Sequence, residues 1–565
     1  MDRRATLATL LGKSNKTNKS ENQDFAPPAS GLDPYTGSWG FENAAHLLRR
    51  ATFGPTVEQV KQSVQDGLNA TVAKLLEDLP MPSPPVNYYY TNDPYTEIGS
   101  SWVDKGYVQG DSNLGQIRTS RFRSLRAWTM EQILTEGVNC REKMTLFWHN
   151  HFVTANEGEP LYVWNYINTL RENSLGNIKE LVKKVTIDAA MLRYLNGNQN
   201  RKNAPNENYA RELLELFTIG KGPLVRFGDY TNYTEDDIKE SAKVLTGWIA
   251  RFSNMYNEYY TKITEFIPNY HDTSSKSLSY RFNYAQIDNA DDEEYKILID
   301  TIFKKRECAR FICRKLYRWF VYYKITPDVE ADVIEPMSQI LHGNGYNVKP
   351  ALEALFKSQH FHDILNVGPM IRNPFDFVFG PMKASYYSEG LPTDLYARYL
   401  QLYNLYTSKL KFNLMQMEYF NHPDVAGWKA YYQEPSFYRI WINSATLPPR
   451  RDVRKYLLYA STSRGVPIES ERLDVLKLAS RLDNPTDPND LIDELTRLLM
   501  PQPISPGQKT YLKELLIPGL PDYEWSIEYG QYLGNPDDKD LKNSIEGKLR
   551  ILLNGILEMP ESYLS

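Results

Sequence analysis

Apolar residues along most of this chain recur every three to four positions, which is the spacing of one face of an α-helix. No regular alternation of strands with helices is visible, which argues against a Rossmann fold or a β/α barrel. We therefore predict a mainly α-helical protein with a large multi-helix globular core. The expected helices cover residues 41–51, 68–76, 121–134, 141–152, 160–172, 206–219 and 234–247, and helical patterning returns from residue 296 onward.

Two stretches depart from the helical pattern. Residues 80–119 are rich in Pro, Tyr, Asn and Gly, which predicts a long surface loop. Between residues 249 and 284, aromatic and polar residues alternate, which predicts a small β-hairpin insertion near 250–284. We expect a disordered leader over 1–35, a helical core domain over 36–380 that carries the hairpin, and a C-terminal helical region over 381–565 packed on that core.

The composition is that of a soluble globular protein, with 41% hydrophobic residues, 24% charged residues and a net charge of -5. No long basic run is present, so nucleic acid is not an expected partner. Three cysteines are too few for a disulfide framework, and the chain has no apolar run of the ~18 residues that a membrane span needs. The leader begins with a twin arginine, as export signals do, but its apolar stretch is short, so export and a cytoplasmic location both stay open.

Chemically capable polar residues interrupt the apolar helical pattern at two places. One is the segment 148–152, Trp-His-Asn-His-Phe, and the other is the segment 206–217. Burying such groups costs free energy unless they are paired or bind a ligand. Each segment is therefore either a structural polar network or a functional site, and the sequence leaves both interpretations open.

The helix predicted after residue 206 carries a polar stripe. At about 100° per residue, Asn208, Arg211, Glu212 and Glu215 fall within roughly 100° of arc. One interpretation is a solvated face with an Arg211–Glu215 ion pair, and another is a buried polar network. The functional interpretation makes Arg211, Glu212 and Glu215 catalytic residues, because paired carboxylates bind metals or transfer protons.

Three histidines are the candidate metal ligands, namely His149, His151 and His271. Neutral imidazole is a common metal ligand, and a cluster of histidines and carboxylates suits zinc, iron or manganese. His149 and His151 diverge by about 200° on a regular helix, so they cannot both face one ligand there. A joint site requires the fold to bring distant segments together. We expect ordinary roles for the histidines near helix ends or loops, which are His342, His360, His362 and His422.

Several segments match the motifs of a known family in the expected order. They are residues 44–55, 143–152, 206–220, 233–238, 245–248, the set His271, Asp272 and Lys276, and residues 552–563. Together they span about residue 40 to residue 565, and the chain resembles the bacterial family called domain of unknown function 1800.

The resemblance implies a large, mostly helical protein. The family itself has no settled activity, so the resemblance does not assign one. It also implies a periplasmic or cell-surface location and a sulfatase-like partner protein encoded nearby, of the family called domain of unknown function 1501. From the matching segments we take Asn206, Glu207, Asn208, Asp272 and Lys276 as candidate binding residues. Asp272 has an alternative role, which is to cap the turn where it lies.

Two functions from different classes follow. The first is a binding or scaffold protein that acts with a partner protein at the cell envelope and whose polar motifs form a structural network. The alternative is a metal-assisted hydrolase of an extracellular polymer or ester, in which His149, His151 and His271 bind a divalent transition metal and Glu212 or Glu215 activates water. The chain has no complete catalytic signature, which favours the first function, and whether it is an enzyme stays open.

Overall fold

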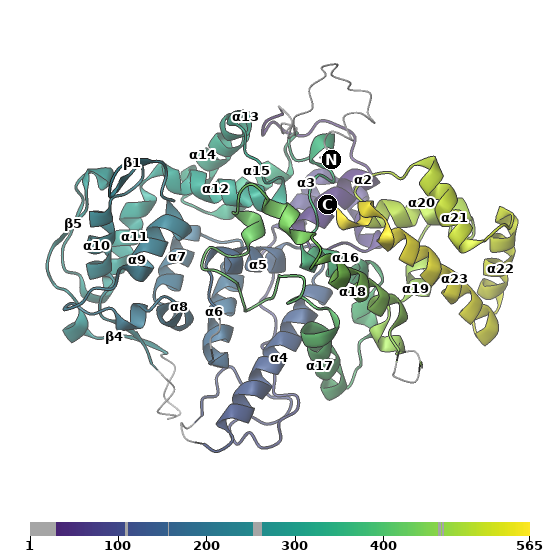
Figure 1. Cartoon of the computed structure of the whole chain (residues 1–565), viewed down its shortest axis with the longest axis horizontal. Coiled ribbons are helices and arrows are strands. Elements are labelled where there is room, and N and C mark those ends of the chain that lie inside the picture. Colours follow the sequence, from purple (N-terminus) through teal and green to yellow (C-terminus); the bar gives the residue numbers. More distant parts are fainter. Residues whose placement is uncertain (1–29, 108–110, 156–157, 252–262, 462–464, 466–467) are drawn as a thin grey trace.

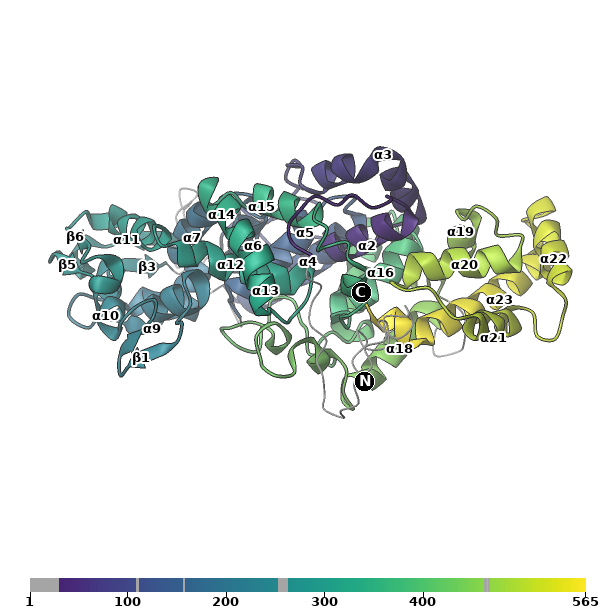
Figure 2. The same ribbon diagram turned by 90° about the horizontal axis from the view of Figure 1, so that it is seen from above.

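The computed structural model describes residues 30–107, 111–155, 158–251, 263–461, 465 and 468–565. Residues 1–29, which make up most of the predicted leader, lie outside the described residues. Helices dominate the described part and its strands are short, which confirms the mainly α-helical prediction. Figures 1 and 2 show an elongated molecule with a central part and two ends.

The central part is built from segments far apart in the sequence (Figure 1). Its helices are α2 (Phe41–Ala51), α3 (Val57–Leu75), α4 (Leu114–Thr135), α5 (Arg141–His151), α6 (Pro160–Glu172), α12 (Arg306–Phe320), α13 (Pro327–Val329), α14 (Glu335–Gly343), α15 (Val348–Phe356), α16 (Pro374–Ala384), α17 (Leu395–Asn404) and α18 (Leu447–Tyr459).

One end of the molecule carries the small sheets and the other end is helical (Figures 1 and 2). The first end contains α7 (Ile178–Thr186), α8 (Ala189–Tyr194), α9 (Glu207–Glu212), α10 (Glu235–Val244) and α11 (Glu294–Phe303). The other end contains α19 (Val475–Ser480), α20 (Pro488–Leu499), α21 (Pro506–Leu516), α22 (Asp522–Gly534) and α23 (Lys539–Glu558).

Within the residues that the structure describes, the strands form three two-stranded antiparallel sheets where one hairpin was expected. They are β1 (Leu224–Arg226) with β2 (Asp229–Tyr230), β3 (Trp248–Ala250) with β4 (Thr264–Phe266), and β5 (Lys276–Ser277) with β6 (Gln286–Ile287). The predicted hairpin near 250–284 falls partly on residues 252–262, outside the described residues. His271 lies between β4 and β5, directly after a short 3₁₀ turn over Pro268–Tyr270.

Several helix boundaries follow the sequence pattern closely, and two do not. The helices 41–51 and 160–172 have the predicted bounds. Helix α4 begins at Leu114, seven residues before the predicted start at 121, so the predicted loop ends earlier. Its first turns are mostly polar, with Ile117 as the first buried apolar residue, so the apolar pattern does not reveal them. Helix α3 starts at Val57 and is kinked at Gly67, where φ is +80°.

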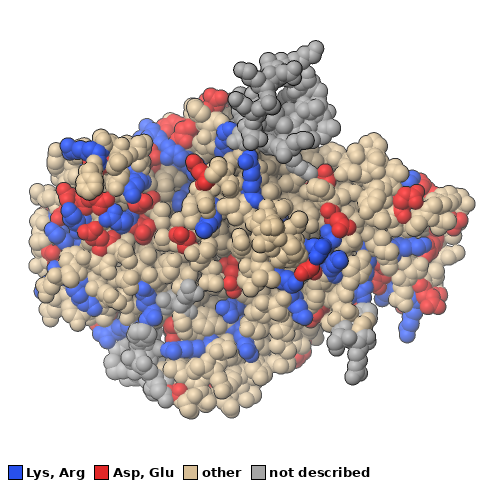
Figure 3. All heavy atoms as spheres, viewed as in Figure 1, with Lys and Arg blue, Asp and Glu red and all other residues tan. Residues whose placement is uncertain are grey.

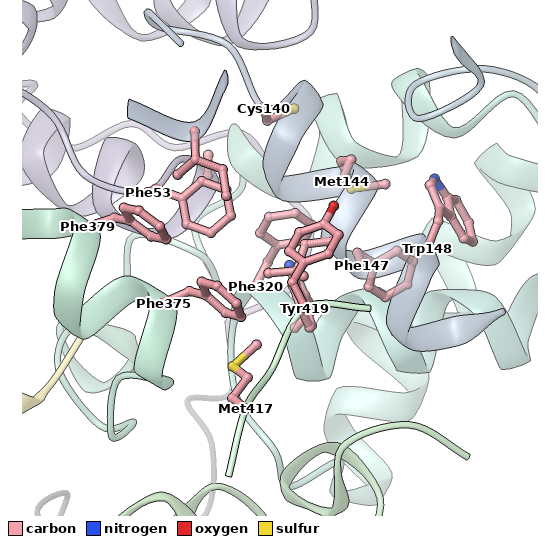
Figure 4. Close-up of a cluster of buried hydrophobic side chains, with 14 of the residues drawn as sticks. Phe53, Cys140, Met144, Phe147, Trp148, Phe320, Phe375, Phe379, Met417 and Tyr419 are labelled. Atoms are coloured by element: carbon pink, nitrogen blue, oxygen red, sulfur yellow. The ribbon is translucent and has the colours of Figure 1, made fainter. Parts of the chain in front are cut away.

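Helix α5 runs through the interior of the central part. All of its residues from Glu142 to His151 are buried. Figure 4 shows Phe147 of α5 in a cluster with Phe375 and Phe379 of α16, and with Tyr419 from the segment after α17. Burial on every face means that the polar groups of α5 need partners inside the protein.

Candidate functional site

The predicted acidic helix starts as expected and changes geometry halfway. Asn206 caps α9, because its side-chain oxygen accepts a hydrogen bond from the Asn208 amide at 2.9 Å. Helix α9 ends at Glu212, and a π-helical turn continues over Leu213–Thr218. This turn changes the register of the polar stripe, since each π-helical turn contains an extra residue.

Arg211 pairs with a neighbouring helix rather than with Glu215. Its guanidinium donates to both carboxylate oxygens of Glu235 on α10, at 2.9 and 2.8 Å, and to Glu207 at 3.2 Å. The hydrogen bond from Arg211 lowers the pKa of Glu235. Charges of both signs gather over this end of the molecule in Figure 3. Arg211 therefore joins α9 to α10 at a partly exposed surface.

The two remaining carboxylates of the stripe lie in different surroundings. Glu215 accepts hydrogen bonds from the Tyr233 hydroxyl at 3.0 Å and from the Lys221 ammonium at 3.2 and 3.3 Å. Burial raises the pKa of Glu212, and the negative charges of Glu215 and Asp424 raise it further. Glu212 is therefore affected by the charges of Glu215 and Asp424, whereas Glu215 is held by Tyr233 and Lys221.

His271 belongs to a buried ion-pair network. Its Nε2 lies 2.8 Å from Glu294 Oε2, and its Nδ1 lies 2.9 Å from the Thr246 carbonyl oxygen. Lys276 is paired with the other oxygen of Glu294 at 2.5 Å, and all three side chains are at most 1% exposed. Burial alone would lower the pKa of His271, but the bonds to Glu294 and Thr246 outweigh it and raise this pKa. Both ring nitrogens are already used.

Asp272 caps the turn after His271. Its carboxylate accepts hydrogen bonds from the Ser274 amide at 2.9 Å and from the Ser274 hydroxyl at 2.5 Å. The Lys276 ammonium donates to the Asp272 carbonyl oxygen. The capping alternative thus accounts for the contacts of Asp272, and Lys276 ties the turn to the buried network.

His151 connects α5 to the π-helical turn. Its Nε2 lies 3.0 Å from the Phe217 carbonyl oxygen, and aromatic rings surround it, including Phe152 at 4.4 Å between centroids. Burial lowers its pKa, with the Lys315 charge adding to the effect. The segment near residue 150 and the acidic helix therefore do meet inside the molecule, through a backbone carbonyl.

His149 faces away from His151 and packs against a histidine from a distant segment. The ring centroids of His149 and His422 are 4.3 Å apart, with the ring planes at 80°. The two residues are 1% and 4% exposed. None of the four ring nitrogens has a hydrogen-bond partner among the described residues. Burial lowers the pKa of His149 to about 3, and burial with the neighbouring His149 lowers the pKa of His422, so both rings are neutral at pH 7.

Two cavities lie against this histidine pair, and Glu418 and Asn421 line both of them. A cavity of about 170 Å³ is lined by Phe122, Arg126, His149, Thr154, Ala155, Val163, Glu418, Phe420 and Asn421. A cavity of about 500 Å³ is lined by Asn413, Gln416, Met417, Glu418, Asn421, His422, Pro423, Trp428, Lys429, Ala430, Ile440 and Trp441. The larger volume is within the range of small-molecule sites, about 300–1,000 Å³.

Asn150 positions the segment that carries His422. Its side-chain oxygen accepts a hydrogen bond from the Trp428 amide at 2.8 Å. Gly427 has a φ of +90°, and a Cβ there would lie 2.4 Å from Asn150 Oδ1, so the close approach requires glycine. The Trp428 ring lies 4.0 Å from the His422 ring between centroids. The Trp-His-Asn-His-Phe segment thus supplies one histidine of the pair and fixes the segment that supplies the other.

The three candidate metal ligands lie apart in the structure. His149 packs on His422, His151 bonds to the Phe217 carbonyl, and His271 bonds to Glu294. Within the described residues, no group of three or more His, Cys, Asp or Glu side chains is placed to hold a metal ion. An ordinary role was expected for His422 because it lies near a helix end or loop, and only its contact with His149 distinguishes it.

Comparisons with known proteins give one match. A family model described as "Protein of unknown function (DUF1800)" matches residues 46–560, which confirms the expected family. No curated protein and no solved structure matches significantly. In the part of the chain that the structure describes, no helix is both long enough and apolar enough to cross a membrane.

Proposed function

The chain belongs to this family of unknown function, and we propose that it is a ligand-binding protein whose site is the pair of cavities at His149 and His422. The observation that carries this proposal is the cavity of about 500 Å³ with His422 in its lining, beside the smaller cavity that has His149 in its lining. Its volume is that of a small-molecule site, about 300–1,000 Å³.

The other polar groups of the motif segments support the structural-network part of the first hypothesis. Arg211 pairs with Glu235, His271 and Lys276 share Glu294, and these contacts join elements to each other. The metal-assisted hydrolase gains no such support, because its three histidines have separate partners. Action with a sulfatase-like partner at the cell envelope stays a prediction.

Thermal unfolding in the presence of small polar compounds tests the proposal. The set contains saccharides, acetate, inorganic phosphate, and zinc and copper salts. A ligand at 100 times its Kd stabilises the folded state by about 2.7 kcal/mol, so we expect at least one compound to raise the midpoint of the wild-type protein. The same compound should have no effect on His422→Leu.

His342→Gln is the matched control, because His342 is an exposed histidine outside both cavities. This variant should respond to the compound as the wild type does. The proposal is overturned if no compound stabilises the wild type, or if His422→Leu is stabilised to the same extent.

A further inference from the structure

Buried cations outnumber buried anions in the central part of the molecule, next to α16. Arg49 and Arg50 on α2, Lys143 on α5 and Arg372 before α16 are each at most 8% exposed. Of these four cations, Lys143 alone forms an ion pair with a carboxylate among the described residues, and that carboxylate is Asp376. Buried charges without counter-ions are costly, so this group favours the binding of a further anion.

A cavity of about 20 Å³ has two of these guanidinium groups in its lining. They belong to Arg49 and Arg372. Burial and the positive charge of Arg372 lower the pKa of Arg49 to about 9, while the exposed Glu42 opposes this change. Burial lowers the pKa of Arg372 to about 10. Both groups are therefore charged at pH 7, and an anion in the cavity would reduce the repulsion between them.

Each of the two guanidinium groups has a terminal nitrogen that is available to a ligand. Arg49 Nη1 donates to two carbonyl oxygens of α20, and Arg372 donates through Nε and Nη2 to carbonyl oxygens of Leu564 and Leu499. Among the described residues, Arg49 Nη2 and Arg372 Nη1 have no hydrogen-bond acceptor, and neither is one of the unpaired nitrogens that are closed to solvent. A species inside the cavity can therefore reach both donors.

Gly380 of α16 leaves the space beside one of these donors. A Cβ at this position would lie 3.7 Å from Arg372 Nη1 and 4.0 Å from the Phe53 carbonyl oxygen. Gly380 and Phe53 both line the cavity. The Phe53 ring packs against Phe379 of α16, with 5.7 Å between the ring centroids (Figure 4). The cavity therefore lies between the segment after α2 and the surface of α16.

The size and the donors of the cavity restrict the species that it can hold. A water molecule needs at least about 10–15 Å³ of such space, so a cavity of about 20 Å³ holds one species of nearly that size. Guanidinium nitrogens only donate hydrogen bonds, so the species must accept from both groups. A halide ion accepts in every direction and supplies a negative charge, whereas a water molecule leaves the cations uncompensated.

We propose that Arg49 and Arg372 bind one chloride ion in this cavity, through Arg49 Nη2 and Arg372 Nη1. The ion connects α2 to the segment that precedes α16. The cavity shares no lining residue with the cavities at His149 and His422, so this site is independent of the proposed ligand-binding function.

Chloride-35 NMR tests the site, because exchange of chloride with a site on a large protein broadens the chloride resonance. We expect the wild-type chain to broaden this resonance in a saturable manner. Gly380→Ala should weaken chloride binding by about tenfold or more, the effect of one lost hydrogen bond to a charged group. The added methyl group occupies the space beside Arg372 Nη1, and its nearest listed neighbour is 3.7 Å away, so the helix accommodates it.

Gly115→Ala is the matched control, since it makes the same change inside α4, where a Cβ meets open space. It should bind chloride as the wild type does. Arg49→Met should also weaken binding by about tenfold or more. Its control is Arg497→Met, because Arg497 is exposed and pairs with Glu42, and this variant should bind chloride with unchanged affinity.

Diffraction from wild-type crystals grown in sodium bromide locates the ion without any variant, because bromide replaces chloride and scatters anomalously. A bromide peak in contact with Arg49 Nη2 and Arg372 Nη1 supports the proposal. A water molecule at this position overturns it. Equal chloride binding by the wild type, Gly380→Ala and Arg49→Met also overturns it.

Discussion

Glu142, a buried charge of α5, is paired by a residue from a neighbouring helix. Glu142 on α5 accepts hydrogen bonds from Arg171 on α6 at 2.7 and 2.8 Å, and the two side chains are at most 1% exposed. The Arg171 guanidinium also lies 4.7 Å from the centre of the Trp128 ring. A pair of this kind fixes the position of α5 relative to α6, and therefore the place of His149.

We expect Glu142→Gln to destabilise the protein by roughly 3–5 kcal/mol, because it leaves the Arg171 charge buried without a counter-ion. Urea unfolding measures this change. Glu172→Gln is the control, since Glu172 is an exposed carboxylate on the same helix as Arg171, and it should change stability by less than about 0.5 kcal/mol. Equal effects of the two substitutions would mean that the buried Glu142–Arg171 pair contributes no more to the free energy of unfolding than an exposed carboxylate does.

The unpaired His149 makes stability depend on pH in a known direction. Burial lowers the pKa of His149 to about 3 in the folded protein, whereas the pKa is ~6.5 in the unfolded chain. The unfolded state therefore binds more protons than the folded state at pH values between these two pKa values. The contribution of neutral His149 to the free energy of unfolding is therefore fully present above ~pH 6.5, and it is lost as the pH falls toward the pKa of the folded state. One such histidine removes roughly 2 kcal/mol between pH 8 and pH 5.

We expect His149→Leu to reduce the stability loss between pH 8 and pH 5 by about 2 kcal/mol. At pH 8 the variant should be as stable as the wild type or more so, because it removes a buried polar group without partners. Urea unfolding at both pH values measures these effects, with the exposed His342→Gln as the control. A marked loss of stability at pH 8 would show that His149 makes a structural interaction.

The residues of the candidate site differ in how far sequence predicts them. Thr234 and Asp237 cap α10 with reciprocal bonds of 3.3 and 2.7 Å, as their spacing in the sequence indicates. The three-residue separation makes that contact local. His422 meets His149 only through tertiary packing, which no local pattern encodes.

At the scale of elements, the π-helical turn after α9 is followed, two residues on, by a glycine with a positive φ. Gly220 has a φ of +68°, and a Cβ there would lie 2.8 Å from the Phe311 ring of α12. The turn also presents the Phe217 carbonyl to His151. The sequence predicts that the helix ends before Gly220 but does not predict the π-helical turn, whose Phe217 carbonyl meets His151 through tertiary packing that no local pattern encodes.

We expect Gly220→Ala to destabilise the protein by roughly 1–3 kcal/mol, since alanine is strained at this φ and its Cβ meets the Phe311 ring. Gly115→Ala is the matched control. Gly115 lies inside α4 with open space around it, so alanine there should stabilise by up to about 1 kcal/mol. Thermal unfolding compares the two, and destabilisation by both would contradict the argument.

At the scale of the whole molecule, the first motif segment contacts the C-terminal part of the chain. Arg50 of α2 donates to the Ser565 hydroxyl at 2.6 Å, and Arg49 donates to the Leu498 carbonyl at 3.1 Å. These contacts join residues near the start of the described chain to α20 and to the C-terminal residue. The predicted division at 380/381 falls inside α16, and the two-domain arrangement stays a prediction.

Arg372, which precedes α16, also contacts α20 and the C-terminal residues. Its guanidinium donates to the carbonyl oxygens of Leu564 at 2.8 Å and Leu499 at 2.7 Å. Burial lowers its pKa to about 10, so the charge is retained at pH 7. Hydrogen bonds to charged groups contribute about 1.5–3 kcal/mol each, while burial of the charge offsets part of this contribution.

We therefore expect Arg372→Met to destabilise the protein by roughly 2–4 kcal/mol in urea unfolding. Arg50→Met, which loses a bond to the same C-terminal segment, should combine with it less than additively, because both side chains hold that segment in place. Arg497→Met is the control, since Arg497 pairs with Glu42 at a surface where both side chains are exposed, and it should cost at most about 1 kcal/mol. Strictly additive losses from Arg372→Met and Arg50→Met would show that the C-terminal segment is not a shared connection, and the two ends of the chain would then be stabilised independently.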